Sequence, residues 1–141
     1  MKPTLICGGM LALAASFGAH ASANPTEDCI DALSAIPALQ PVADKVALSR
    51  STQARAVRVA DRAPTAQERD ALALWLIKRN DCFDAGAAER RAVATPQQIA
   101  FTRSVFVFQQ RLVADLQAGR MTYAEFNRRR AELATAAGEE I

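Results

Sequence analysis

The sequence predicts an all-α protein: an irregular antiparallel bundle of four main helices and a short N-terminal helix, held by one disulfide. Two observations predict the helices. Thr65, Thr95 and Thr122 each stand where a helix N-cap is expected, and the segments that follow them repeat apolar residues at helical spacing. The third observation is a pair of cysteines, Cys29 and Cys82, which predicts the disulfide.

Residues 1–23 have the features of a signal peptide. An apolar run covers residues 5–17, and residues 21–23 read Ala-Ser-Ala, the small residues that a signal peptidase accepts. A retained anchor is the competing interpretation, although a run of roughly 13 residues is shorter than the roughly 20 that span a bilayer. We expect cleavage, which would leave residues 24–141 as a single helical domain in the periplasm or the medium.

Charge and composition exclude several functions. The full chain has a formal net charge of +2, and Lys2 is the only charged residue within 1–23. The mature chain is therefore almost neutral, and we expect no nucleic-acid partner. The only histidine of the full sequence, His20, lies in the predicted signal peptide, so the mature chain contains none. This excludes Ser-His-Asp and Cys-His catalysis, histidine-ligated haem and nearly every zinc site, so we expect no metal or cofactor.

Cys29 and Cys82 are the cysteines that remain after signal cleavage. An exported protein folds in an oxidising compartment, which favours pairing them. Such a bridge would contribute about 4 kcal/mol by restricting the unfolded chain. A redox-active pair is the alternative, but catalytic cysteines commonly lie as Cys-x-x-Cys. We therefore predict a structural disulfide that ties the N-terminal arm to the body.

The N-terminal arm, residues 24–50, starts with a capped helix. Asn24 is the expected cap, followed by a proline and two acids, and prolines should end the helix at Ile36. Residues 38–50 fit either a helical turn or an extended arm on the body, and we predict a non-helical arm. A further helix is predicted from Ser51 or Thr52 to about Arg62.

The next helix is the most apolar one. Thr65 and Glu68 have the spacing of a capping box, and residues 71–77 are seven consecutive apolar residues. Two turns without a polar face indicate a central helix with neighbours on most sides. We predict that Trp75 packs in the core rather than stacking on a ligand.

A C-terminal helical hairpin is predicted for residues 95–137. Its first helix starts at Thr95, and its wide apolar stripe includes a coiled-coil-like seam with alternating steps of four and three residues. The seam consists of Phe101, Val105, Phe108 and Leu112. This stripe fits either the core of the bundle or, in part, a surface that accepts another protein.

The turn of the hairpin has its own signals. Gly119 is expected to end the first helix in a left-handed conformation. Thr122 and Glu125 should start the second helix with a capping box. The motif Leu-x3-Leu…Gly-x-x-Thr-x-x-Glu-Phe…Leu resembles the short C-terminal (SHOCT-type) hairpin over residues 112–133, at Leu112, Leu116, Gly119, Thr122, Glu125, Phe126 and Leu133. The resemblance implies an appended interaction or oligomerisation element rather than an enzyme.

This chain departs from that motif in two ways. The helix before the turn is far longer than the motif requires, and Ala124 stands where a second acid is common. Over the whole chain, the disulfide arm, the spacing from Trp75 to Cys82 and the Gly-Arg-Met-Thr-Tyr-Ala-Glu-Phe ending resemble small exported helical proteins of Gram-negative bacteria. That second resemblance implies a compartment and no activity.

Three consecutive arginines, Arg128, Arg129 and Arg130, form the most concentrated charge. They suggest a site for phosphate, lipopolysaccharide or nucleic acid, but three successive residues splay across about 200° of a helix. Glu125 and Glu132 lie one turn away and are expected to pair with Arg129 and Arg128. We predict a solvated face whose arginine stems cover the edge of the core.

Two function classes remain open. A non-catalytic interaction or structural module of the periplasm is favoured, with another envelope protein or a second copy as partner, because the informative residues are caps, core and a disulfide. A small-ligand carrier or a histidine-free enzyme is the alternative. A loose acidic group is the only candidate for such an enzyme, and we interpret it as a solvated helix end: Asp81, Asp84 and Glu89.

Overall fold

The computed structural model describes residues 24–49 and 61–138, and this part of the chain consists of helices and turns without a strand. It confirms the all-α prediction. The helices are α1 (Pro25–Ala32), α3 (Ala66–Ala85), α4 (Ala87–Val93), α5 (Pro96–Gln117) and α6 (Tyr123–Ala136), with 3-10 helices η1 (Leu33–Ala35) and η2 (Pro37–Val42).

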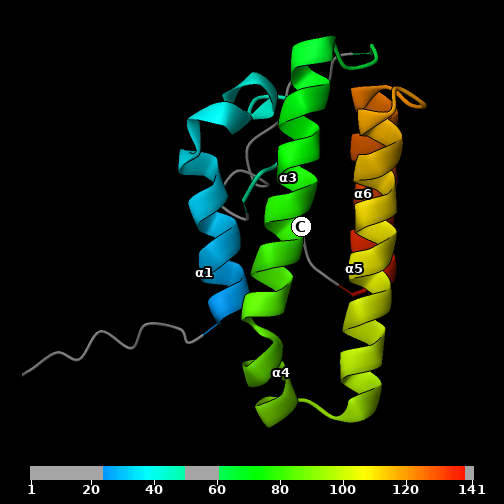
Figure 1. Ribbon diagram of the computed structural model, residues 1–141. Helices are drawn as coiled ribbons and strands as arrows, with labels where there is room; N and C mark the ends of the chain where they lie inside the picture. Colours follow the sequence, from blue (N-terminus) through cyan, green and yellow to red (C-terminus); the bar gives the residue numbers. More distant parts are fainter. Residues whose placement is uncertain (1–23, 50–60, 139–141) are drawn as a thin grey trace, which may run out of the picture.

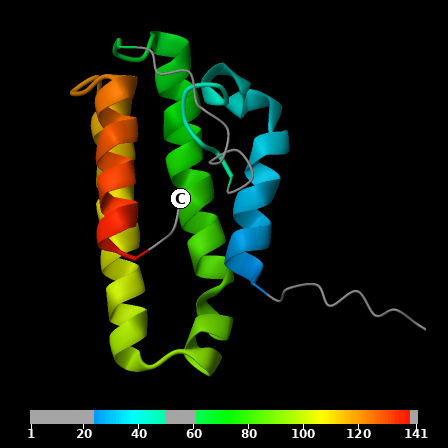
Figure 2. The ribbon, with the colours of Figure 1, turned by 180° about the vertical axis from the view of Figure 1, so that it is seen from behind.

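Helix α3 is the centre of the bundle, as its run of apolar residues predicted. It contacts α1, η2, α4 and α5. Figures 1 and 2 show α1 on one side of α3 and the antiparallel pair α5 and α6 on the other. Helix α4 lies at the end of α3, and the chain returns along α3 as α5. The elements that could build a site therefore meet around the C-terminal half of α3.

The disulfide is confirmed. The sulfur atoms of Cys29 and Cys82 are 1.99 Å apart and the Cα atoms are 5.3 Å apart. The bridge fixes α1 on α3 just before Gly86, where α3 gives way to α4. Gly86 is buried, and a Cβ atom there would overlap the hydroxyl of Thr26 on α1. A glycine at this position is therefore what permits α1 to approach so closely.

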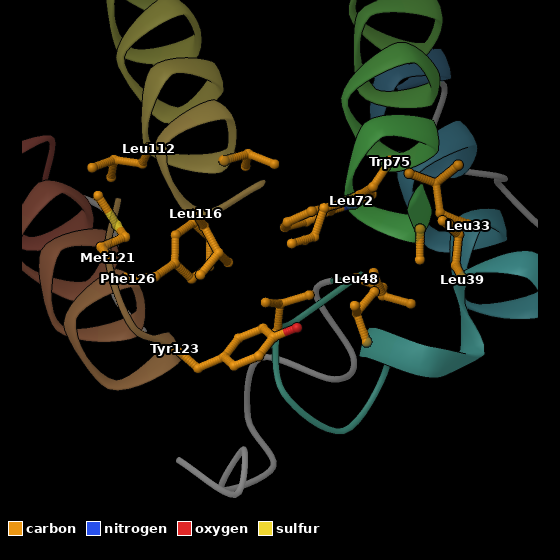
Figure 3. Close-up of a cluster of buried hydrophobic side chains, with 14 of the residues drawn as sticks. Leu33, Leu39, Leu48, Leu72, Trp75, Leu112, Leu116, Met121, Tyr123 and Phe126 are labelled. Carbon is orange, nitrogen blue, oxygen red and sulfur yellow. The ribbon is translucent and has the colours of Figure 1, made fainter. Parts of the chain in front are cut away.

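The core lies between α3, the hairpin and the N-terminal arm (Figure 3). Trp75 is completely buried, as predicted, and meets Phe126 edge to face with ring centroids 6.3 Å apart. Leu39, Val42 and Leu48 of the arm are also completely or almost completely buried. The arm therefore supplies one wall of the core.

The prediction that residues 38–50 are non-helical is wrong for residues 38–42. These belong to η2, whose short turns are closed by Leu39 N–H to Ile36 O (3.0 Å) and Ala43 N–H to Gln40 O (3.2 Å). A proline at the first position fits because it lacks only a donor that the helix start does not use. The predicted helix from residue 51 lies largely outside the described residues, and at its expected end Asp61 and Arg62 form a bend.

The hairpin turn forms as predicted, with one correction. Gly119 has a φ of 73°, and the Thr122 hydroxyl accepts the Glu125 N–H at 3.2 Å. The other half of the predicted capping box is absent from the described hydrogen bonds, because the Glu125 carboxylate pairs with Arg129 at 2.6 Å instead. Reciprocal boxes form at Thr65 with Glu68 and at Thr95 with Gln98.

Candidate functional site

The predicted seam on α5 is divided into a covered and an uncovered part. Leu112 is buried, whereas Phe108 is 49% exposed and Phe101 is 55% exposed. The cause is the length of the partner helix, since α6 has 14 residues and α5 has 22. Figure 2 shows α6 beside only the part of α5 nearest the turn. We call Phe101, Val105 and Phe108 the apolar strip.

Another aromatic residue of α5 makes the contact with α3. Phe106 stacks on Phe83, with ring centroids 4.1 Å apart and planes at 14°. Its neighbours in sequence, Val105 and Val107, point to either side of this stack and line different cavities. The seam spacing alone did not identify Phe106 as the contact with α3.

The three consecutive arginines do not form one site. Arg128 pairs with Glu132 at 2.8 Å and Arg129 with Glu125 at 2.6 Å, both on the solvent side as predicted. Arg130 instead turns towards the body. It donates to the Ala47 carbonyl at 2.8 Å, and its guanidinium carbon lies 5.9 Å from the centroid of the Trp75 ring.

A second arginine, Arg79 of α3, lies on the same tryptophan and was not predicted to be a site residue. It is 4% exposed, with its guanidinium carbon 5.2 Å from the Trp75 centroid. Its Nε donates to Gln110 Oε1 at 3.0 Å and its Nη2 to Gln109 Oε1 at 2.6 Å. Gln110 is itself held in place, since its amide nitrogen donates to the Leu76 carbonyl at 3.1 Å.

The sequence contains a signal for this burial. Arg79 stands four residues after Trp75 and three before Cys82, both of which are completely buried. Those spacings place the three residues on one face of a helix. The charge of Arg79, next to Lys78 and Asn80, conceals the pattern.

Arg79 is a buried cation whose hydrogen bonds go to neutral groups. Burial and the nearby charge of Arg130 lower its pKa to about 9, so it remains protonated at neutral pH. Among residues 24–49 and 61–138, no carboxylate forms an ion pair with it. A buried charge without a counter-ion is costly, and cation–π contact with Trp75 offsets only part of that cost.

A cavity of about 340 Å³ lies against this cation. Its walls come from α1, α3, α4 and α5, together with Ser49 and Arg130. We call it the arginine cavity, because Arg79, Arg90 and Arg130 all line it. Arg90 is held by two contacts: its guanidinium carbon lies 3.8 Å from the centroid of the Phe83 ring, and its Nη1 donates to the Thr26 hydroxyl at 2.8 Å.

Glu68, near the start of α3, is another charged side chain whose pKa is strongly shifted, and it belongs to a polar cluster. Glu68 is 6% exposed and accepts two hydrogen bonds from Arg62, each of 2.7 Å, and one from the Thr65 N–H at 2.8 Å. Lys45 lies 3.4 Å away. Hydrogen bonding to Arg62 is the main reason that the pKa of Glu68 falls to about 2. This cluster joins the arm, the segment before α3 and α3 itself.

Tyr123 of α6 adjoins the same cluster. Its backbone N–H donates to the Arg62 carbonyl at 3.1 Å, and Arg62 lies over its ring at 5.6 Å. Burial raises the pKa of its hydroxyl. The hydroxyl is therefore neutral at ordinary pH, and the contacts with Arg62 join the start of α6 to the segment before α3.

The acidic residues Asp81, Asp84 and Glu89 differ in their surroundings: Asp81 and Asp84 are exposed, whereas Glu89 is half-buried and lines the arginine cavity. Asp81 is exposed and pairs with Lys78 at 3.3 Å. Within the described ranges, no group of three or more histidine, cysteine, aspartate or glutamate side chains is arranged to hold a metal ion. The same ranges contain no helix that is long and apolar enough to cross a membrane. Comparison of the chain with protein-family models, curated proteins and solved structures found no match.

Proposed function

We propose that this protein is a non-catalytic interaction module of the periplasm or the extracellular space. The apolar strip on α5 is the observation that carries the proposal. Phe101 and Phe108 lie seven residues apart on one face of the helix and are each about half exposed. Two large aromatic side chains on the free end of a long helix are typical of a protein-binding surface.

The compartment is supported by the disulfide and by the predicted signal peptide. A bridge between Cys29 and Cys82 is compatible with an oxidising environment. Cleavage after residue 23 remains a prediction, since residues 1–23 lie outside the described part of the chain. Intact mass of protein from a periplasmic extract should begin at Asn24 and be two hydrogens lighter than the reduced form.

The partner that we propose is a second copy of the chain, with another envelope protein as the alternative. The SHOCT-type resemblance of residues 112–133 implies an interaction or oligomerisation element, which is compatible with self-association. The strip continues the line of Leu112, which α6 already covers. An α5 helix from a second molecule would therefore extend an existing helix–helix contact. The proposal involves no nucleic acid and no cofactor.

Sedimentation velocity over a concentration series tests this proposal. The double variant Phe101→Ser/Phe108→Ser should lose self-association, while the wild type should show a dimer that dissociates on dilution. Ile77→Ser is a matched control, because Ile77 is 57% exposed but lies on α3. A photo-crosslinker at position 101 should also link two copies in the cell envelope. A monomeric wild type that forms no crosslink from position 101 would refute the proposal.

A further inference from the structure

We propose that the arginine cavity is a binding site for a small organic carboxylate with an apolar body. Arg79 supplies the buried positive charge in its lining. This inference stands on the geometry of the cavity. Of the apolar strip, Val105 also lines the cavity, whereas Phe101 and Phe108, on which the proposed self-association depends, are not among its lining residues. The proposed ligand is a small molecule, whereas the apolar strip is proposed to bind a protein.

The unbalanced charge of Arg79 is the first argument. Its two described hydrogen bonds use Nε and Nη2 and go to the neutral amides of Gln110 and Gln109. A guanidinium has five N–H donors in a planar fork that matches a carboxylate. An anion in the cavity would give Arg79 the direct ion pair that it makes with no carboxylate of the described residues, and burial of Arg79 would strengthen that contact.

Pre-organisation is the second argument. The Arg79 guanidinium carbon lies 5.2 Å from the Trp75 centroid and 5.8 Å from the Phe106 centroid, and its hydrogen bonds to Gln110 and Gln109 hold it in place. Gln109 also lines the cavity, and its amide oxygen is occupied by Arg79. A ligand would thus meet a charge already held in one orientation, which reduces the entropy lost on binding.

The remaining walls indicate the body of the ligand. Ile30, Phe83, Val105 and Phe106 present apolar side chains to the same cavity. Its volume of about 340 Å³ suits a molecule of a few carbon atoms rather than a large cofactor. Glu27 and Glu89 also line it. Their negative charges oppose multiply charged anions such as phosphate and favour a single carboxylate.

The fluorescence of Trp75 can report on ligand binding in the cavity. It is the only tryptophan of the chain and lies under both Arg79 and Arg130. We would titrate the purified oxidised protein with hexanoate and follow tryptophan fluorescence at constant ionic strength. Hexanoate should give a saturable change with a Kd of about 1 mM or tighter. Hexanamide, the neutral isostere, and inorganic phosphate should each bind at least tenfold more weakly.

Variants separate a binding site from a structural arginine. Arg79→Gln should weaken hexanoate binding at least tenfold. Arg130→Gln should also weaken it, and this second variant keeps the test decisive if the first does not fold. Arg128→Gln is the control, because it removes the same charge from the same helix on the solvent side. It should leave the Kd unchanged.

Three results would overturn the inference. The first is no saturable fluorescence change with hexanoate up to about 20 mM, well above the millimolar range expected for so small a ligand. The second is equal binding of hexanamide or phosphate. The third is an unchanged Kd in both Arg79→Gln and Arg130→Gln, which would mean that hexanoate binds elsewhere.

Discussion

Replacement of Glu68 by glutamine should destabilise the protein at neutral pH and have almost no effect in acid. Glutamine retains the oxygen that accepts the Thr65 N–H, and Gln98 fills the same role at the start of α5. The helix cap therefore survives the change. What is lost is the charge that pairs with Arg62 and lies near Lys45.

The pKa of Glu68 sets the magnitude and the pH range. The carboxylate has a pKa of about 2 in the folded protein, against an ordinary value of 4.5. A lowered pKa means that the ionised form stabilises the folded state above the unfolded pKa. That contribution is lost as the pH falls from about 4.5 to about 2. The shift corresponds to at most about 3 kcal/mol, reduced by screening because Arg62 is partly exposed.

Urea unfolding from pH 7 down to pH 2 measures this contribution. Carboxylates other than Glu68 titrate in both proteins, so the difference in unfolding free energy between wild type and Glu68→Gln isolates one group. That difference should be about 2 to 3 kcal/mol at pH 6 and approach zero near pH 2. Glu132→Gln is the control, since its exposed pair with Arg128 should contribute under about 1 kcal/mol. A difference that stays constant over the whole range would refute the reasoning.

Three further predictions concern close packing and the hairpin. Gly86→Ala should cost about 1 to 3 kcal/mol in thermal unfolding because its Cβ would overlap Thr26. The double variant with Thr26→Ala should recover part of that loss, and purely additive effects would contradict this. Gly119→Val should cost about 1 to 2 kcal/mol through its φ of 73°, with Gly119→Asn milder; equal melting temperatures would exclude a left-handed turn. Changing Arg128 and Arg129 together to glutamine should shift stability by no more than about 1 kcal/mol, and a larger loss would show that they do more than solvate α6.

Local sequence patterns were sufficient to predict where three of the helices begin. Thr65, Thr95 and Thr122 cap their helices in the structure because a threonine hydroxyl accepts an N–H only three residues away. The hydrogen-bonding partner of the Glu125 carboxylate could not be predicted from the capping-box spacing alone. Arg129 lies one turn further on and competes with the Thr122 N–H for the carboxylate. Glu125 fits both a capping box with Thr122 and an ion pair with Arg129 one turn later, and the ion pair is the one that forms.

The site was far less predictable than the helices. Arg130 was grouped with Arg128 and Arg129 by sequence, yet it reaches the Ala47 carbonyl and Trp75. Those partners belong to segments distant in the chain, and no spacing within α6 indicates them. The division of the α5 seam likewise depends on how far α6 extends beside it. Helical periodicity predicts which residues share a face but not how much of that face a neighbour covers.

The sequence by itself determined the all-α class, the central position of α3, the disulfide between Cys29 and Cys82 and the left-handed turn at Gly119. Each depends on the chemistry of a few residues: apolar runs, an oxidisable pair, a residue without a side chain. The spacing from Trp75 and Cys82 signals that Arg79 shares their buried face, but only the tertiary structure decided that it lines a cavity and that Phe101 and Phe108 are exposed. Burial is a property of the space between helices, and that space is set by their relative lengths and by which faces meet.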